Sequence, residues 1–339
     1  MRNILVLAAI LILNVQTLSQ VFGNEGFESY FDFYEEIKIS SEILLGDISV
    51  LDCFNNKYFL VTDLIGNEVY LVNNKGDLMK KLDPEECHPG FRWRPLFSFF
   101  NQAGNIYVIN SAPWGFRFGK IGECLGPMDK TFLATYSFAF ANDSSIIGYY
   151  TGEDGNYLKK MNYNGKEISR FGIFPEEYKN FIHRFEAGGV VCDKDNNIYQ
   201  VNLNSPKIIK YNSKGKMEKE FGKNPSYFRK ISDDISNNPN NLINEISKKL
   251  ASNTLVDKIF LLSDKMIAVQ LIHKTGKKKD FPYGLEIYDL DGNYLLKEEI
   301  NYNFPVLTSE DGYIYFSSQP KADEKGNLPN PNIISYKFK

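Results

Sequence analysis

The sequence predicts an all-β fold built from repeated four-stranded antiparallel sheets, and three observations support this prediction. Aromatic residues, which favour strands, make up 14% of the 339 residues. Short runs of β-forming residues alternate with glycine, asparagine and aspartate, which favour tight turns. The same succession of runs and turns recurs along nearly the whole chain. Folds made of such repeats run long as one domain, so a single domain is expected.

The clearest copy of the repeat is VVCDKDNNIYQVNLNSPKIIKYNSKGKMEKEFG, at residues 190–222. It contains the β-forming runs NIYQV and KIIKY, and Gly215 lies where a tight hairpin needs a positive φ. Four antiparallel strands in a unit of this size are typical of one β-propeller blade, for which the period is about 40–50 residues.

The pattern D-x-x-x-N-I-Y-x-V, then I-x-K-Y-N-x-x-G and a terminal F-G, resembles an NHL-type repeat. It is also similar to the six-bladed propeller proteins that many bacteria export. The resemblance covers nearly all of the chain after its N-terminal segment. It implies a six-bladed β-propeller and no particular activity, because one fold carries many functions.

Residues 1–23 are predicted to be a signal peptide. Arg2 precedes an apolar run at 4–13, which is shorter than the about 20 residues that span a bilayer and suits a signal sequence. The alternative interpretation is an uncleaved N-terminal membrane anchor. Since the first cysteine is Cys53, lipid attachment is not expected. The expected location is therefore periplasmic or extracellular, with no membrane span after cleavage.

Five complete copies of the unit and one incomplete copy follow in residues 24–339. Their expected strands are 47–54, 58–63, 68–73 and 77–82; 95–100, 106–112, 116–121 and 131–135; 136–141, 146–150, 157–162 and 166–171; the four strands of 190–222; 259–263, 266–273, 284–289 and 293–299; and 304–309, 313–318 and 332–338. The sixth copy lacks a fourth strand, while the strand-like segment 35–42 has no neighbour in sequence. Pairing the two closes the ring and removes its open edges.

The loops fall into two classes with different positions. Connections between blades, and loops between second and third strands, lie on one face of a propeller; the remaining turns lie on the other. Nearly all of the long insertions belong to the first class, at 84–94, 173–189, 223–258, 274–283 and 319–331. We call that side the insertion face and expect binding there.

The longest insertion, 223–258, is predicted to contain a helix. Leu242, Ile246 and Leu250 follow helical spacing. The helix either covers the seam between the fourth and fifth blades or forms a lid over a site.

Both tryptophans are expected on the insertion face of the second blade. Arginines accompany them, and the loop 173–189 is expected to form an opposite wall. The candidate ligand-binding residues are Arg92, Trp93, Arg94, Trp114, Arg117, His183 and Arg184. Aromatic rings beside guanidinium groups suit sugars, peptide aromatics or anions. In the alternative interpretation the tryptophans fill gaps between blades, with the arginine stems packed over them.

A second candidate site is a ring of oxygen ligands at the mouth of the central channel. It consists of Asp47, Glu186, Asp257 and Asn303. Such residues suit Ca²⁺, as in lactonase-type six-bladed propellers. Only three histidines occur, without zinc spacing, and no phosphate loop or nucleophile elbow is present. We therefore expect no cofactor, with Ca²⁺ as the alternative.

Two functions remain open from the sequence. The first is a binding scaffold, expected to be monomeric, that recognises a protein, a glycan or a small ligand through the insertion face. The alternative is a Ca²⁺-dependent hydrolase or lyase with its site at the channel mouth. A structural role within an envelope assembly is a third possibility. The net charge of −3 argues against a general nucleic-acid binder.

The four cysteines give conflicting indications. An exported chain with four cysteines suggests disulfides. The expected blades, however, place Cys53 and Cys192 across the ring from each other, and Cys87 and Cys124 near opposite faces. Bridged Cα atoms must lie within about 7 Å. Four free thiols are therefore expected, unless the strand assignment of the second blade is wrong.

Overall fold

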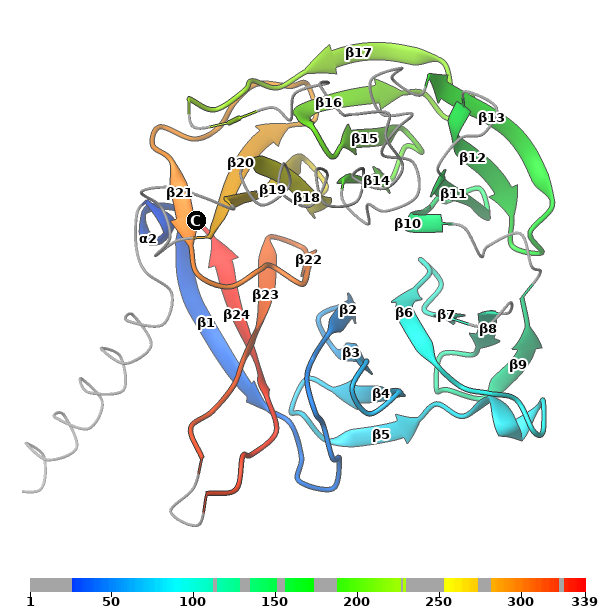
Figure 1. Ribbon diagram of the computed structural model, residues 1–339. Helices are drawn as coiled ribbons and strands as arrows, with labels where there is room; N and C mark the ends of the chain where they lie inside the picture. The colour runs from blue at the N-terminus through cyan, green and yellow to red at the C-terminus, as the bar shows by residue number, and fades with distance from the viewer. Residues whose placement is uncertain are drawn as a thin grey trace, which may run out of the picture.

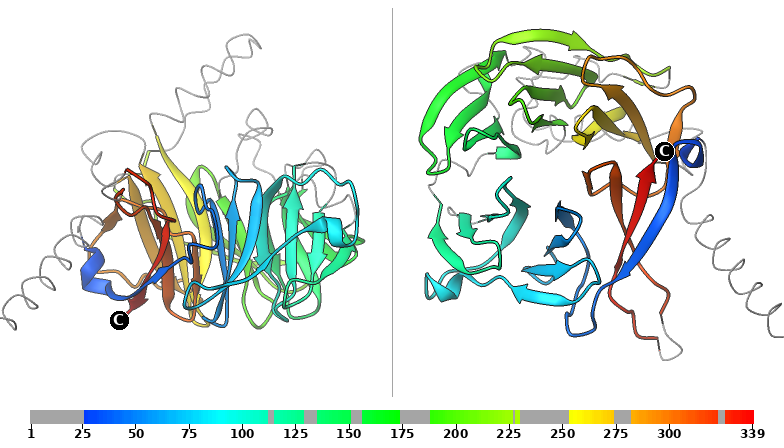
Figure 2. Two further views of the ribbon diagram at one scale, coloured as in Figure 1. Left: turned by 90° about the horizontal axis from the view of Figure 1, so that it is seen from below. Right: turned by 180° about the vertical axis from the view of Figure 1, so that it is seen from behind.

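The computed structural model describes residues 26–111, 115–128, 135–150, 156–173, 188–226, 228–229, 253–273, 282–322 and 326–339. Over these residues the chain forms six four-stranded antiparallel sheets, arranged as blades in a ring (Figure 1). The view from behind shows the same ring of blades, and the other view shows it from the side (Figure 2). The protein is a six-bladed β-propeller.

The first three blades, each from its innermost strand outwards, follow one another along the chain. Blade 1 contains β2 (Val50–Phe54), β3 (Tyr58–Asp63), β4 (Glu68–Asn73) and β5 (Leu78–Lys81). Blade 2 contains β6 (Pro95–Phe100), β7 (Ile106–Asn110), β8 (Gly115–Phe118) and β9 (Cys124–Pro127). Blade 3 contains β10 (Thr135–Phe140), β11 (Ser145–Tyr150), β12 (Asn156–Asn162) and β13 (Glu167–Ile173).

The second half of the ring follows the same order. Blade 4 contains β14 (Gly188–Cys192), β15 (Ile198–Asn202), β16 (Ser205–Tyr211) and β17 (Met217–Phe221). Blade 5 contains β18 (Thr254–Ser263), β19 (Met266–His273), β20 (Tyr283–Asp289) and β21 (Ile300–Tyr302). Blade 6 contains β22 (Thr308–Glu310), β23 (Tyr313–Ser318), β24 (Asn332–Phe338) and β1 (Phe31–Lys38).

Blade 6 combines strands from both ends of the chain. β1 runs antiparallel to β24, from the pair Phe31↔Phe338 to the pair Lys38↔Asn332, and both strands lie side by side in Figures 1 and 2. The strand begins and ends four residues earlier than the expected segment 35–42. Its early start follows from burial, because Phe27 of α2 (Phe27–Tyr30) stacks on Phe31 at 4.8 Å within the core. It ends where Ile43 donates to the Ser40 carbonyl in a turn.

The core is divided among the seams of the ring. Within the described residues, six hydrophobic clusters each join two neighbouring blades. This follows from strand geometry, since successive side chains point to opposite faces of a sheet and each blade has a neighbour on both faces. The second strands of the blades are consequently buried at nearly every position, as in β7 and β15, where all five residues are buried.

Four of the hairpins between third and fourth strands share one hydrogen-bonded design. In each, an asparagine or aspartate oxygen accepts from the backbone N–H four residues later, and a glycine with φ of 79–86° follows it. The residues are Asn73 and Gly76, Asn162 and Gly165, Asn212 and Gly215, and Asp289 and Gly292. These are the turns that the glycine pattern of the sequence predicted.

The strand assignment of blade 2 differs from the expected one. Its outer strand is β9, at Cys124–Pro127, whereas the sequence favoured 131–135. The reason is a hairpin in which Gly119 donates to the Glu123 carbonyl at 2.9 Å, with Gly122 at a φ of 85°. This turn begins at Gly119, within the segment 116–121 that was expected to continue as strand.

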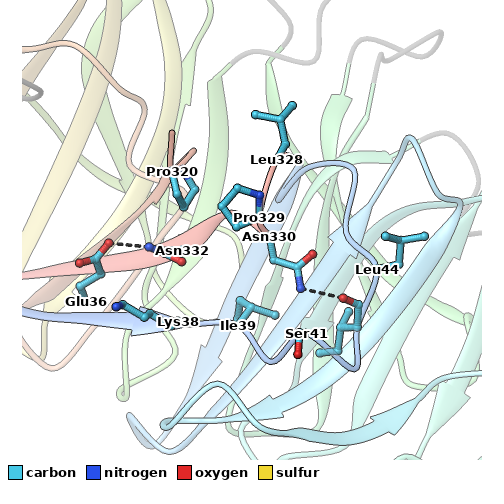
Figure 3. Close-up of a pocket in the computed structure, with 11 residues that line it drawn as sticks. Glu36, Lys38, Ile39, Ser41, Leu44, Pro320, Leu328, Pro329, Asn330 and Asn332 are labelled. Carbon is cyan, nitrogen blue, oxygen red and sulfur yellow. Dashed lines mark hydrogen bonds between the residues drawn. The ribbon is translucent and has the colours of Figure 1, made fainter. Parts of the chain in front are cut away.

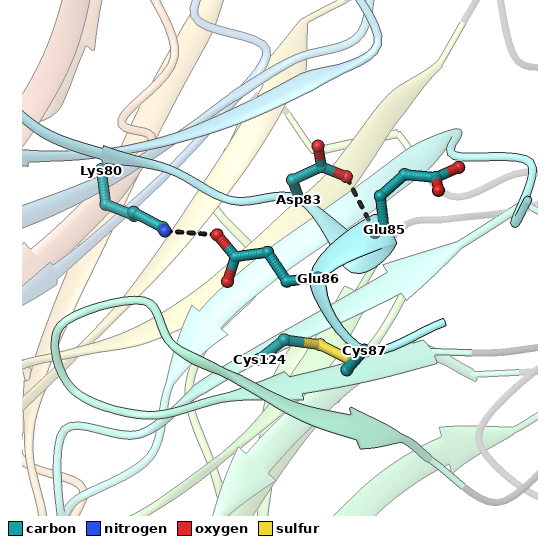
Figure 4. Close-up of a disulfide and its surroundings, with 6 residues drawn as sticks. All are labelled: Lys80, Asp83, Glu85, Glu86, Cys87 and Cys124. Atoms are coloured by element: carbon teal, nitrogen blue, oxygen red, sulfur yellow. Dashed lines mark hydrogen bonds and ion pairs between the residues drawn. A yellow bond between two sulfur atoms is a disulfide. The ribbon is translucent and has the colours of Figure 1, made fainter. Parts of the chain in front are cut away.

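The corrected strand brings Cys124 beside Cys87, and the two form a disulfide with their Cα atoms 5.9 Å apart (Figure 4). Cys87 directly follows the short 3₁₀ helix η1 (Pro84–Glu86) in the connection from blade 1. The expectation of four free thiols is therefore wrong for this pair. Cys53 and Cys192 are free and buried, and burial raises the pKa of both thiols.

Blade 5 also departs from expectation at both ends. Its inner strand begins at Thr254, so the last residues of the insertion 223–258 belong to the sheet. Its outer strand is Ile300–Tyr302 instead of 293–299. The earlier segment contacts β20 through the bridge Tyr288↔Tyr294 and the hydrogen bond from the Leu295 N–H to the Ile287 carbonyl, and it is not a strand. The predicted helix at 241–250 lies outside the described residues.

Candidate functional site at the mouth of the central channel

The first strands of the blades surround a cavity of about 580 Å³. Its walls come from the beginnings of these strands and from the residues just before them, such as Ser49, Phe97, Ser137 and Pro305. Because each inner strand begins where the connection from the preceding blade ends, this is the insertion-face end of the channel. A second hollow of about 440 Å³ is lined by the opposite strand ends and shares Asp52 and Thr308 with the first.

Inner strands of three blades carry a bulge at this mouth. The pairing register shifts between Pro95 and Phe97, between Thr135 and Ser137, and between Val256 and Lys258. The additional residues are Leu96, Tyr136 and Asp257. A bulge bends its strand and re-aims one residue, and bulges are frequent beside functional sites. The bulge in β18 lies at Asp257, next to Lys258, and both residues line the cavity.

A buried hydrogen-bond network fixes the Asp257 carboxylate. It accepts a hydrogen bond from Nε2 of Gln270, which is fully buried. Oε1 of Gln270 in turn accepts from the Tyr302 hydroxyl at 2.6 Å and from the Val306 N–H at 2.7 Å. Such networks restrict side-chain rotation, so this carboxylate is held in one position before any ligand arrives.

Lys258 places a positive charge beside this carboxylate. Its Nζ donates to the carbonyl of Leu307 at 3.3 Å. Loss of solvation lowers the pKa of the ammonium, while the neighbouring Asp257 charge opposes that shift. The cavity therefore offers a fixed acceptor and an ammonium group in adjacent positions.

Asp52 connects three blades across the channel wall. One oxygen of its carboxyl accepts from the Phe100 N–H of blade 2 at 2.7 Å, and the other from the Thr308 hydroxyl of blade 6 at 3.2 Å. Burial raises the pKa of this carboxyl to about 7, and the two hydrogen bonds oppose that rise only in part. Near neutral pH the group can thus hold or release a proton.

The rest of the lining is mainly apolar and includes several aromatic residues. Phe97, Phe99 and Phe138 are half-buried, and Tyr283 stacks against Tyr302 with 5.9 Å between ring centroids. Small-molecule sites typically combine apolar and aromatic walls with a few fixed polar groups in a volume of about 300–1,000 Å³. The channel mouth has both properties.

The ligand-binding residues expected in blade 2 are only partly brought together. Trp93 is half-buried in the seam between blades 1 and 2, at 6.0 Å from the Phe116 ring and 6.3 Å from the Phe118 ring. Arg92 and Arg94, on either side of it, are exposed. Asn110 fixes their backbone by donating to the Arg92 carbonyl and accepting from the Arg94 N–H.

Arg117 lies on the other side of the same sheet. It stands between Phe116 and Phe118 in β8, which both face blade 1, so alternation directs it towards blade 3. Its register partner is Tyr107, a member of the cluster between blades 2 and 3. The structure thus separates Arg117 from Trp93. Trp114, His183 and Arg184 lie outside the described residues.

Of the expected metal ligands, Asp257 is the one that the described structure places in the cavity lining. Asp47 is exposed and accepts from the Ser49 hydroxyl at 3.4 Å, while Asn303 is half-buried directly after β21. Glu186 is outside the described residues. Among the residues with assigned positions, no group of three His, Cys, Asp or Glu side chains is placed to hold a metal ion.

Asp52 and Lys258 were not among the site residues predicted from the sequence. Each is a charged residue within a largely apolar strand, VLDCF and TLVDKIFLLS respectively. These charged positions could have indicated the site, because a charge in such a strand needs a partner or a function.

No family model and no curated protein matches the chain. A solved structure of a Bacteroides fragilis NCTC 9343 protein, whose name describes it as exported, aligns with a TM-score of 0.61 and 11% identity, covering 94% of this chain and 98% of that one. A DUF4221 family member from Bacteroides vulgatus ATCC 8482 aligns with a TM-score of 0.63 and 12% identity, covering 91% and 97%. At these identities the similarity shows a shared fold.

A streptogramin B lyase aligns more weakly, with a TM-score of 0.49 and 11% identity over 93% of this chain and 100% of that one.

In the part of the chain that the structure describes, no helix has both the length and the apolar character needed to cross a bilayer.

Proposed function

We propose that this protein is an exported β-propeller that binds a small ring-containing molecule with hydrogen-bond donors at the insertion-face mouth of its channel. The observation that carries the proposal is the cavity of about 580 Å³, which aromatic residues line together with Asp257 and Lys258. A ring would pack on the phenylalanine walls. The fixed Asp257 carboxylate would accept from a hydroxyl or ammonium group of the ligand.

Export is supported by three independent features. The N-terminal segment has the charge and apolar run of a signal peptide. The Cys87–Cys124 disulfide suits an oxidising compartment. A protein with the same fold is named as exported.

The test is a thermal-shift screen of the full chain against pyranose sugars and aromatic amines, with affinities of the best probes then measured by calorimetry. A probe at 100 times its Kd should stabilise the fold by about 2.7 kcal/mol. Asp257→Asn should weaken binding at least tenfold, because a hydrogen bond to a charged group contributes about 1.5–3 kcal/mol.

The matched control is Asp264→Asn, an exposed aspartate in the first turn of the same blade, on the opposite face. It should leave binding unchanged. Equal loss in both variants, or no stabilisation by any probe, would contradict the proposal. Binding that a chelator abolishes would instead favour the Ca²⁺-dependent alternative.

A further inference from the structure

A second cavity of about 580 Å³ lies at the seam between blades 6 and 1 (Figure 3). It forms where the connection from β1 to β2 passes the loop between β23 and β24. None of its lining residues belongs to the channel cavity. It is therefore a separate site, independent of the function proposed above.

Asn330 holds the two walls of this pocket together. Its Oδ1 accepts from the Leu45 N–H at 3.1 Å, and its Nδ2 donates to the carbonyls of Ser40 at 2.9 Å and Ile43 at 2.7 Å. Beneath this amide, Ile39 and Ile43 are buried in the seam. The walls are thus fixed by a saturated amide and a packed core, which makes the pocket pre-organised.

Two opposite charges lie along one side of the pocket. Glu36 and Lys38 are two residues apart on β1, so they share a face of the strand, about 7 Å apart along it. Asn332 donates to one oxygen of the Glu36 carboxylate, leaving the other available to a ligand (Figure 3). Within the described residues, the Lys38 ammonium has no ion-pair or hydrogen-bond partner, and both charged side chains are exposed.

The remaining wall is apolar and open. Leu44 is 87% exposed and Leu328 is 70% exposed, and both line the pocket together with Pro320 and Pro329. Figure 3 shows Leu328 and Leu44 at the rim, away from the charged pair. Large apolar side chains exposed around one hollow often mark a binding surface.

We propose that this pocket binds a free α-amino acid with a large apolar side chain. The carboxylate of Glu36 takes the α-ammonium group, and the ammonium of Lys38 takes the α-carboxylate. The apolar side chain lies between Leu44, Leu328 and Pro329. A zwitterion fits two separated opposite charges better than a simple ion does, because each end forms a charge-assisted hydrogen bond.

Calorimetry on the full chain tests this with L-phenylalanine, N-acetyl-phenylalanine, phenylalaninamide and glycine. Phenylalanine is expected to bind, and the two derivatives, each lacking one charge, should bind at least tenfold more weakly. Glycine, which lacks the apolar group, should also bind weakly. If N-acetyl-phenylalanine binds as well as phenylalanine, the ligand is a peptide C-terminus and the proposal is overturned.

Substitutions locate the site. Glu36→Gln and Lys38→Met should each weaken phenylalanine binding at least tenfold, whereas Asp257→Asn in the channel should not. The matched controls are Glu220→Gln and Lys207→Met, an exposed pair on blade 4, which should leave binding unchanged. All these side chains are exposed or partly exposed, so the variants should fold, which circular dichroism checks. Unchanged binding in both pocket variants, or loss in Asp257→Asn alone, overturns the assignment.

Discussion

The carboxyl group of Asp52 shows how one residue couples the ring to pH. It is half-buried and fixed by donors from blades 2 and 6. Burial favours the neutral form and raises its pKa to about 7. In the unfolded chain the pKa is about 3.9. Between these values the folded protein holds a proton that the unfolded chain has released.

The free energy of unfolding should therefore fall as pH rises from about 4 through 7, by at most about 4 kcal/mol from this group. Asp52→Asn keeps an acceptor for Phe100 and removes the titration, so the variant should gain stability relative to the wild type between about pH 4.5 and about pH 8. Urea unfolding at both pH values measures this. The control is Asp195→Asn, which changes an exposed aspartate. If the free energy of unfolding depends equally on pH in the wild type and in Asp52→Asn, the assignment is refuted.

At the scale of the element, the hairpin glycines of blades 1, 2, 4 and 5 lie against the preceding blade. A Cβ placed on Gly215 would lie 2.6 Å from the Phe171 ring at the end of the preceding blade. The same contact recurs between Gly292 and Phe221. The glycine thus serves two purposes, a positive φ for the turn and room for an aromatic ring.

Two substitutions separate these purposes. Gly326 has a φ of 82°, and a Cβ added there would meet no atom within 4 Å, so Gly326→Ala tests backbone strain alone, at about 1–2 kcal/mol. Gly215→Ala adds the clash with Phe171 and should cost about 1–3 kcal/mol more. Chemical denaturation compares the two variants. Equal losses of stability in the two variants would mean that the Phe171 ring moves aside at no cost in free energy.

The disulfide joins the connection after blade 1 to the outer strand of blade 2, enclosing a sequence separation of 37 residues. Loop-closure entropy gives about 4 kcal/mol for a loop of this length. The double variant Cys87→Ser and Cys124→Ser should lose stability of that order. Thiol titration after unfolding without reductant should detect two groups, Cys53 and Cys192. Four reactive thiols would show that the bond does not form.

The turns and the strands could be predicted wherever a local signal was strong. Hairpins that begin with asparagine or aspartate were located correctly, because the side-chain oxygen caps its own turn. The hairpin of blade 2 begins instead with Gly119, and its outer strand, CLGP, contains both glycine and proline. Both features disfavour a strand, so its pairing depends on tertiary contacts that the sequence does not show.

The site was less predictable than the fold for a related reason. Asp257 was identified from its position before an inner strand, but the bulge that adds Lys258 to the same cavity depends on pairing with β19. The direction of the Arg117 side chain depends on the strand register of blade 2, which was predicted correctly only in part. Side chains from several blades converge at the channel, and no local sequence pattern predicts the distances between them.

For the whole molecule, β1 completes the sixth blade as its outermost strand. Its pairing with β24 covers the edge of a strand that would otherwise be open. The neighbouring seam depends on it too, because Ile37 of β1 packs in the cluster shared by blades 6 and 1. Across the same seam, Glu310 of blade 6 accepts from the backbone of Asn55 at 2.8 Å and of Asn56 at 2.6 Å in the first turn of blade 1.

Removing residues 31–41 should therefore expose the β24 edge together with the apolar seam beneath it, and the protein should aggregate. Light scattering and size-exclusion chromatography measure this. Tyr34→Ser is the control, since that side chain is 54% exposed and its loss leaves the pairing intact. A synthetic peptide of residues 31–41 added during refolding should restore the monomer, because it supplies the missing strand along with Phe31, which packs on Phe27 in the core of the seam between blades 5 and 6. A truncated protein that stays monomeric with an unchanged melting temperature would show that five blades and a three-stranded sixth are sufficient, and that the N-terminal strand is an addition to a ring already closed.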